Sequence, residues 1–88
     1  MIFFSAEVCN NGYYVYTDEL FSNTDTRVAN YIGMELKDYV KILKSFRAKC
    51  SCFGEYFFSD EEDCQKCCDY LNEIYGPIIV LTGGFLDD

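Results

Sequence analysis

The fold is decided by residues 54–81, GEYFFSDEEDCQKCCDYLNEIYGPIIVL, which predict a strand, a helix and a second strand. Residues 55–58 form a short aromatic run and residues 78–81 are mostly β-branched, as expected of strands. Between them, apolar residues recur at intervals of three and four, which predicts an amphipathic helix with one buried face. The residues at this spacing are Cys64, Cys67, Cys68, Leu71, Ile74 and Tyr75.

The predicted helix has a strongly acidic start. Ser59 precedes Glu62 by three positions, the spacing of a capping box, so the helix is expected to start at Ser59. Residues 60–63 are all acidic and fill the first turn, where the helix dipole favours each carboxylate by about 0.3–1 kcal/mol. Helix capping accounts for this acidic run, so it gives no reason to expect a catalytic pair of carboxylates. Gly76-Pro77 is expected to end the helix.

Length and composition predict a single domain that spans residues 1–88. A chain of 88 residues has too little apolar surface for two separate cores. Half of the residues are hydrophobic, and eight Phe together with eight Tyr oppose intrinsic disorder. We find no apolar run long enough for a membrane span and no signal-peptide pattern. A cytoplasmic location is therefore expected, in which the six cysteines stay reduced.

The net charge of −8 is unevenly distributed along the chain. Residues 24–49 hold six basic and three acidic residues, whereas residues 50–88 hold nine acidic residues and one basic residue. Such a charge opposes sequence-independent binding to nucleic acid, because phosphate contacts need clustered Lys and Arg. It suits docking on a basic, nucleic-acid-binding surface, although solubility alone accounts for it equally well.

A first hairpin is predicted in residues 2–17. Asn11-Gly12 favours a type I′ turn, because that turn needs positive φ at both central residues. A two-residue loop there would pair Cys9 with Tyr14 and Glu7 with Tyr16. Cys9, Tyr14 and Tyr16 would then lie on the outer face. The face expected to reach the core carries Phe4, Ala6, Val8, Tyr13, Val15 and Thr17.

Residues 28–46 have apolar side chains at helical spacing, and Gly33-Met34 either weakens this helix or divides it in two. The divided form, TRVANYIGMELKDYVKIL at residues 26–43, resembles a helix-turn-helix with Gly33 in the turn. A hairpin at residues 48–58 would supply a wing. The resemblance implies a DNA-binding regulator as an alternative function, although Glu35 and Asp38 would meet phosphates. Its basic contacts would be Lys37, Lys41, Lys44 and Arg47.

The hairpin at residues 48–58 is expected to turn at Phe53-Gly54. From residue 13 onward the predicted order is strand, long helix, strand, strand, helix and strand. This order resembles the ferredoxin-like split βαβ arrangement, preceded here by one extra strand of an N-terminal hairpin. The implied fold class is α+β, with two helices packed on one face of an antiparallel sheet. Many activities occur on this fold, so it implies none of them. Residues 85–88 are expected to form an acidic tail.

The six cysteines allow two interpretations. Cys64, Cys67 and Cys68 occupy the apolar positions of the predicted helix, where buried thiols act as small hydrophobic side chains. Alternatively, Cys50, Cys52, Cys64 and Cys67 are a possible set of zinc ligands in a zinc-stabilised structural module, although zinc sites usually have two C-x₂₋₄-C pairs in loops. We favour core packing and expect no metal.

Catalytic chemistry has little support in the sequence. The chain has no His, so it lacks the usual base of Cys–His and Ser–His pairs. Thr82-Gly83-Gly84 follows a predicted strand but lacks the lysine of a P-loop. We therefore expect neither an enzyme nor a cofactor.

Aromatic side chains beside acidic ones point to a protein interface instead. Tyr contributes large contact area at low entropic cost, and acidic residues steer a protein towards a basic partner. The aromatic candidates are Tyr14, Tyr16, Tyr56 and Tyr70, beside Glu55, Asp60, Glu61, Asp69 and Glu73. Ordinary Tyr on a half-buried sheet is the alternative explanation.

In size, acidity and overall character the chain resembles the small inhibitors of phages and mobile elements, such as anti-CRISPR proteins. The resemblance implies steric blockade, in which acidic side chains stand in for phosphates on a basic channel of a nuclease or Cas effector. It implies no direct binding of nucleic acid and no membrane. A homo-oligomer that pairs through an edge strand or the Tyr surface is a further alternative. The expected contacts are Glu55, Tyr56, Asp60, Glu61, Glu62 and Asp63.

Overall fold

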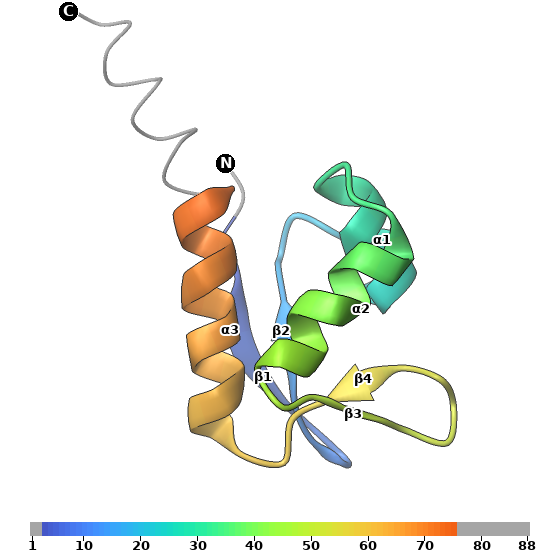
Figure 1. Ribbon diagram of the computed structural model, residues 1–88, viewed down its shortest axis with the longest axis vertical. Coiled ribbons are helices and arrows are strands. Elements are labelled where there is room, and N and C mark those ends of the chain that lie inside the picture. The colour runs from blue at the N-terminus through green and yellow to red at the C-terminus, as the bar shows by residue number, and fades with distance from the viewer. Residues whose placement is uncertain (1–2, 76–88) are drawn as a thin grey trace, which may run out of the picture.

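The computed structural model describes residues 3–75 of the chain as an α+β fold (Figure 1). The elements, in order, are β1 (Ser5–Cys9), β2 (Gly12–Tyr16), α1 (Asp25–Tyr31), α2 (Leu36–Ser45), β3 (Lys49–Cys50), β4 (Tyr56–Phe57) and α3 (Glu61–Ile74). The predicted α+β class is confirmed. The predicted strand at 78–81, the helix stop at Gly76-Pro77 and the tail at 85–88 lie outside the described residues. The ferredoxin-like arrangement, which needs that strand, therefore stays a prediction.

The first hairpin forms where predicted, but its turn lies one residue earlier. Cys9 pairs with Gly12 and Glu7 with Tyr14, so the turn consists of Asn10 and Asn11. The predicted pairs of Cys9 with Tyr14 and Glu7 with Tyr16 are therefore wrong. Arg47 is the one non-glycine residue between positions 3 and 75 with positive φ, so this is not a type I′ turn either.

The side chains predicted to face the core are mostly the ones that do so, although the register differs from the prediction. Each residue faces a partner two positions away from the predicted one, and side chains alternate with a period of two. Phe4, Val15 and Thr17 are buried accordingly, and Ala6 packs against the core. Val8 is the exception, because it lies near the turn and is 72 % exposed.

Within the described part of the chain, one backbone bridge joins the two hairpins. The N–H of Tyr13 donates to the carbonyl of Phe58 (2.8 Å), and the N–H of Phe58 donates to the carbonyl of Tyr13 (2.7 Å). Gly12 makes this approach possible, because a Cβ at that position would overlap the carbonyl oxygen of Phe58. Its φ of +147° also suits glycine alone. Gly12 is thus required by the bridge between hairpins, which explains why it does not serve as a central turn residue.

The region from 25 to 46 is divided into two helices at Gly33. Gly33 has a φ of +75°, and its N–H donates to the carbonyl of Asn30 (3.1 Å). The N–H of Met34 donates to the carbonyl of Ala29 (2.9 Å), which completes a Schellman cap on α1. The same pattern ends α2, where Arg47 takes the left-handed position at a φ of 77°. The divided form of the predicted helix is therefore correct.

The hairpin between α2 and α3 has a wider turn than predicted. Lys49 pairs with Phe57 and Cys50 with Tyr56, and the N–H of Ser51 donates to the carbonyl of Glu55 (2.7 Å). The loop therefore spans residues 52–54, with Gly54 in the left-handed region at a φ of +86°. A bulky Phe53 disfavours a primed two-residue turn, and the predicted Phe53-Gly54 turn is wrong.

Helix α3 packs on the inner face of the first hairpin (Figure 1). Cys64, Cys67, Cys68 and Leu71 are fully buried, which confirms the predicted apolar face. The helix begins one residue later than predicted, because Asp60, not Ser59, is the N-cap residue. Its side chain accepts a hydrogen bond from the N–H of Glu62 (3.1 Å).

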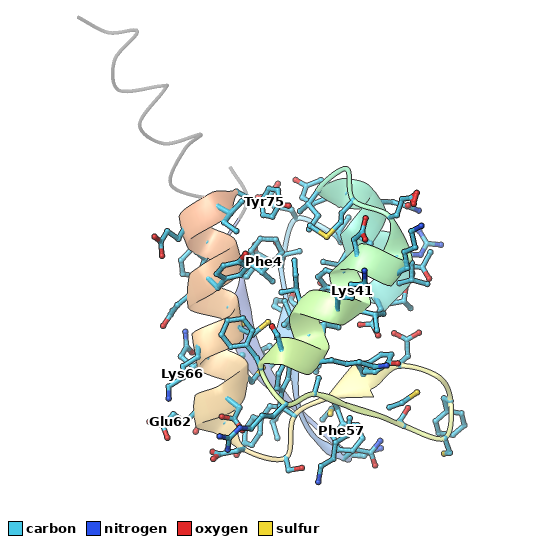
Figure 2. The ribbon with its side chains drawn as sticks, viewed as in Figure 1. Phe4, Lys41, Phe57, Glu62, Lys66 and Tyr75 are labelled. Atoms are coloured by element: carbon cyan, nitrogen blue, oxygen red, sulfur yellow. The ribbon has the colours of Figure 1, made fainter. Side chains whose placement is uncertain are left out.

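Two polar side chains reach the core from the helices. Asn72 of α3 binds both backbone groups of Phe4, accepting from its N–H (2.7 Å) and donating to its carbonyl (2.9 Å). Figure 2 shows Phe4 beside α3. Tyr39 of α2 is fully buried, and within residues 3–75 its hydroxyl has no hydrogen-bond partner. Burial raises the pKa of Tyr39 well above its usual value, and the nearby Asp25 adds to this shift.

Replacing Gly12 tests the bridge between the hairpins. Gly12→Ala is expected to destabilise the protein by about 1–3 kcal/mol beyond a control substitution, since the new Cβ forces Tyr13 and Phe58 apart. Gly54→Ala is the control, because Gly54 also has positive φ but has open space around its Cβ position. Urea unfolding of the two variants measures the difference. Equal losses would contradict a close contact at Gly12.

Asn72→Ala tests the attachment of the N-terminal strand. It leaves the N–H and carbonyl of the buried Phe4 without their partner, so a loss of about 1–3 kcal/mol in the free energy of unfolding is expected. Asn30→Ala, at an exposed position on α1, gains the same helix propensity without this loss and serves as the control. A loss for Asn72→Ala no larger than for the control would show that the Phe4 contacts contribute nothing.

Candidate partner-binding surface

The predicted acidic run lies at the start of α3. The Asp60 side chain caps the helix, Glu61 and Glu62 are exposed, and Asp63 is half-buried. Figure 2 shows Glu62 and Lys66 projecting from α3 on the side away from α2. Among residues 3–75, the carboxylates of Glu61 and Glu62 have no partner, whereas the Asp60 carboxylate accepts a hydrogen bond from its own helix.

Glu55 and Tyr56 lie elsewhere, where the second hairpin meets the start of α1. One carboxylate oxygen of Glu55 accepts a hydrogen bond from the N–H of Asp25 (2.8 Å). One oxygen of Asp25 in turn accepts from the N–H of Tyr56 (2.8 Å). These two bonds tie the first residue of α1 to the edge of β4. The capping residue of α1, Thr24, accepts from the N–H of Arg27 (3.3 Å).

Asp25 has an unusual protonation equilibrium. The pKa of Asp25 is raised from 3.8 to about 6, and burial is the largest cause. The hydrogen bond from Tyr56 acts in the opposite direction, and the neighbouring Glu55 carboxylate raises the pKa further. The sequence alone does not predict this role of Asp25, because it depends on Glu55, thirty positions away.

An open groove of about 450 Å³ lies between the outer face of the first hairpin and the second hairpin. Aromatic side chains contribute much of its lining, together with the carboxylates of Asp25 and Glu55. Among the described residues, no Lys or Arg lines it. Its aromatic lining consists of Tyr14, Tyr16, Phe21, Phe53, Tyr56 and Phe57.

Several of these rings are unusually exposed. Phe21 is fully exposed and Phe53 is 86 % exposed, although both are large and apolar. The rings of Tyr14 and Tyr16 meet edge to face, with centroids 6.2 Å apart. Exposed aromatic side chains around a concave surface are typical of binding sites.

The structure separates the predicted contact residues into two groups. Glu55 and Tyr56 line the groove with Tyr14 and Tyr16, as the predicted pairing of Tyr with acidic residues requires. Residues 60–63 do not line it, because α3 packs on the opposite face of the first hairpin. Tyr70 is also separate, since its ring packs on Phe46 with centroids 5.5 Å apart.

Four of the seven basic residues lie on α2 and the turn that follows it. Lys37, Lys41 and Lys44 are all exposed, as is Arg47, and Figure 2 shows Lys41 on α2. Within residues 3–75 there is one ion pair, between Lys37 and Glu35 (3.6 Å). The Lys44 ammonium lies 5.8 Å from the centroid of the Tyr56 ring.

The cysteines divide as the core-packing interpretation predicts. Cys64, Cys67 and Cys68 are buried, and burial raises the pKa of the Cys67 thiol to about 12. Cys50 and Cys52 are exposed on the second hairpin. In the described part of the chain, His, Cys, Asp and Glu side chains nowhere gather in a group of three that could hold a metal ion. The alternative zinc site at Cys50, Cys52, Cys64 and Cys67 therefore gains no support.

Comparison with known proteins gives no relative. No protein-family model, no curated protein and no solved structure matches the chain. Among residues 3–75, none of the helices has the length and apolar character needed to cross a membrane.

The pKa of Asp25 predicts a specific dependence of stability on pH. Since the folded state holds the Asp25 proton more tightly than the unfolded state, its contribution to stability is largest below pH 3.8. That contribution is lost as the pH rises to about 6. Asp25→Asn removes the ionisation and keeps an acceptor for Tyr56, so the variant should gain stability relative to wild type between acidic and neutral pH.

Urea unfolding at about pH 4 and about pH 7.5 measures this gain, with Asp18→Asn as the control for loss of one exposed negative charge. A stability difference between Asp25→Asn and wild type that stays constant with pH would contradict the raised pKa.

Proposed function

We propose that this chain is a small non-enzymatic protein-binding module that blocks a basic nucleic-acid-binding surface of a partner, as phage-type anti-CRISPR and other anti-defence inhibitors do. The groove is the observation that carries this proposal. It combines exposed aromatic rings with two carboxylates, and no basic residue of the described chain lines it. Such a surface complements a cationic partner and repels phosphate.

The acidic start of α3 has a separate part in this proposal. Glu61 and Glu62 are exposed and unpaired among residues 3–75, but they lie away from the groove. Charges outside the contact surface raise the association rate by steering a basic partner. We assign the groove, with Glu55 and Tyr56, to contact, and assign the α3 carboxylates to steering.

Competition with nucleic acid tests the proposed blockade. The immobilised protein should retain a basic nucleic-acid-binding protein from host lysate, and added DNA or RNA should release that partner. Blockade requires the two ligands to exclude each other, so a purified partner that holds both at once would contradict the proposal.

Neutralising the α3 carboxylates tests the assignment to steering. The double substitution Glu61→Gln and Glu62→Gln should lower the association rate constant at low salt by about 2- to 10-fold, with little change in the dissociation rate constant. Asp18→Asn with Asp38→Asn, at two exposed residues that make no ion pair within residues 3–75, is the matched control for loss of two charges. Stopped-flow measurements separate the two rates, and an effect confined to dissociation would contradict steering.

A winged-helix-like DNA-binding regulator is the second candidate, favoured by the order of elements. Helices α1 and α2 are separated by a short turn at Gly33, and the β3–β4 hairpin that follows lies next to β2 through the bridge at Phe58. The ferredoxin-like arrangement predicted from the sequence has the same order of β2, β4 and β3. The strand order therefore does not distinguish a winged-helix fold from a ferredoxin-like fold. Exposed Glu35 and Asp38 at the start of α2 weaken the DNA-binding candidate.

Binding to duplex DNA separates this candidate from blockade. Fluorescence anisotropy with a labelled duplex should detect no binding at physiological salt if the chain is a blocking module. Binding with a steep dependence on salt, weakened by Lys41→Gln and Lys44→Gln, would instead support the regulator and overturn our proposal.

A further inference from the structure

The groove has two carboxylates whose environment leaves them electrostatically unsatisfied. Each uses one oxygen to accept a backbone hydrogen bond, Glu55 from Asp25 and Asp25 from Tyr56. Neither makes an ion pair within residues 3–75. The two charges also repel each other, since Glu55 raises the pKa of Asp25. A cation placed between them would remove this repulsion.

The rings around these carboxylates favour a planar cation. Tyr14 and Tyr16 present an edge-to-face pair on the outer side of β2, and Phe21 and Phe53 are almost wholly exposed. A guanidinium group stacks on aromatic faces and binds carboxylates through two parallel N–H donors, whereas an ammonium is a compact, strongly hydrated charge. The groove is open rather than closed over, which suits a side chain presented by a polypeptide.

We propose that the groove binds an extended segment of the partner and seats one arginine side chain against Asp25 and Glu55, among the aromatic rings. This inference rests on the proposed protein-binding function and names the chemical class of what the groove recognises. The contacting groups come from four parts of the chain: β2, the loop between β2 and α1, the start of α1, and the turn that leads into β4.

The proposal predicts that the affinity of the groove for arginine depends on pH. The groups that face Asp25 are Glu55 and Tyr56 from the second hairpin and Tyr39 from α2. Because the pKa of Asp25 is about 6, its carboxylate is ionised at neutral pH and largely protonated at about pH 5. Arginine binding needs the ionised form, so affinity should fall over this interval.

The test uses a short blocked peptide with one central arginine and flanking glycines, added to ¹⁵N-labelled protein. We expect saturable shifts of the amides of Asp25, Glu55 and Tyr56, weaker at about pH 5 than at about pH 7.5. The same peptide with citrulline keeps the shape without the charge and should not bind. A lysine peptide should bind more weakly, because it lacks the planar fork.

Asp25→Asn with Glu55→Gln keeps acceptors for both backbone N–H groups and should weaken the arginine peptide about fivefold, removing its dependence on pH. Asp18→Asn with Asp38→Asn, two exposed residues outside the groove, is the matched control for loss of two negative charges. Three results would each overturn the proposal: no saturable shift, equal binding of citrulline, or shifts at the start of α3 instead of the groove.

Binding experiments with the full partner distinguish a failure of the arginine site from a failure of the proposed blocking function. If partner binding competes with nucleic acid but ignores the double substitution in the groove, the arginine site is wrong and the blocking function stands. If nucleic acid does not compete while the peptide binds as described, the blocking function is wrong and the groove still recognises arginine.

Discussion

The two hydrogen bonds between Tyr13 and Phe58 set how the two hairpins lie against each other, because they join segments that are far apart in sequence. Each hairpin by itself is small, and an isolated two-stranded hairpin is marginally stable at best. The bridge depends on Gly12, where any side chain would overlap the Phe58 carbonyl. It also fixes the point from which the chain enters α3, since Phe58 is followed by the Asp60 cap.

The groove follows from this arrangement. With β4 placed against β2, the outer rings of Tyr14 and Tyr16 lie across from Tyr56 and Glu55. Asp25 then connects α1 to the same edge through its bonds with Glu55 and Tyr56. Burial of Asp25 has an electrostatic cost that a bound cation would offset, so one set of contacts supports both the local structure and the proposed recognition of a basic partner.

The sequence predicts the pattern of side chains better than it predicts their exact positions. The buried face of α3 follows from the spacing of Cys64, Cys67 and Leu71, and the inner face of the first hairpin withstands a change in register because strand periodicity is two. The turn at Asn10 and Asn11 lies one residue before its predicted position, because the contact of Gly12 with Phe58 is tertiary. The N-cap lies one residue after its predicted position, because Ser59 and Asp60 are both good N-cap residues and the local pattern does not distinguish them. The groove and Asp25 could not be predicted, since they depend on contacts between residues about thirty positions apart.

Native-state hydrogen exchange at the amides of Tyr13 and Phe58 tests the central claim most directly. If these amides bond each other as described, both should exchange slowly, with protection close to that of the buried face of α3. The amide of Cys52, which is exposed in the loop of the second hairpin and has no hydrogen-bond acceptor within residues 3–75, provides the unprotected reference. Exchange of Tyr13 and Phe58 as fast as this loop would show that the hairpins are not joined, and would contradict the fold, the groove and the function proposed from it.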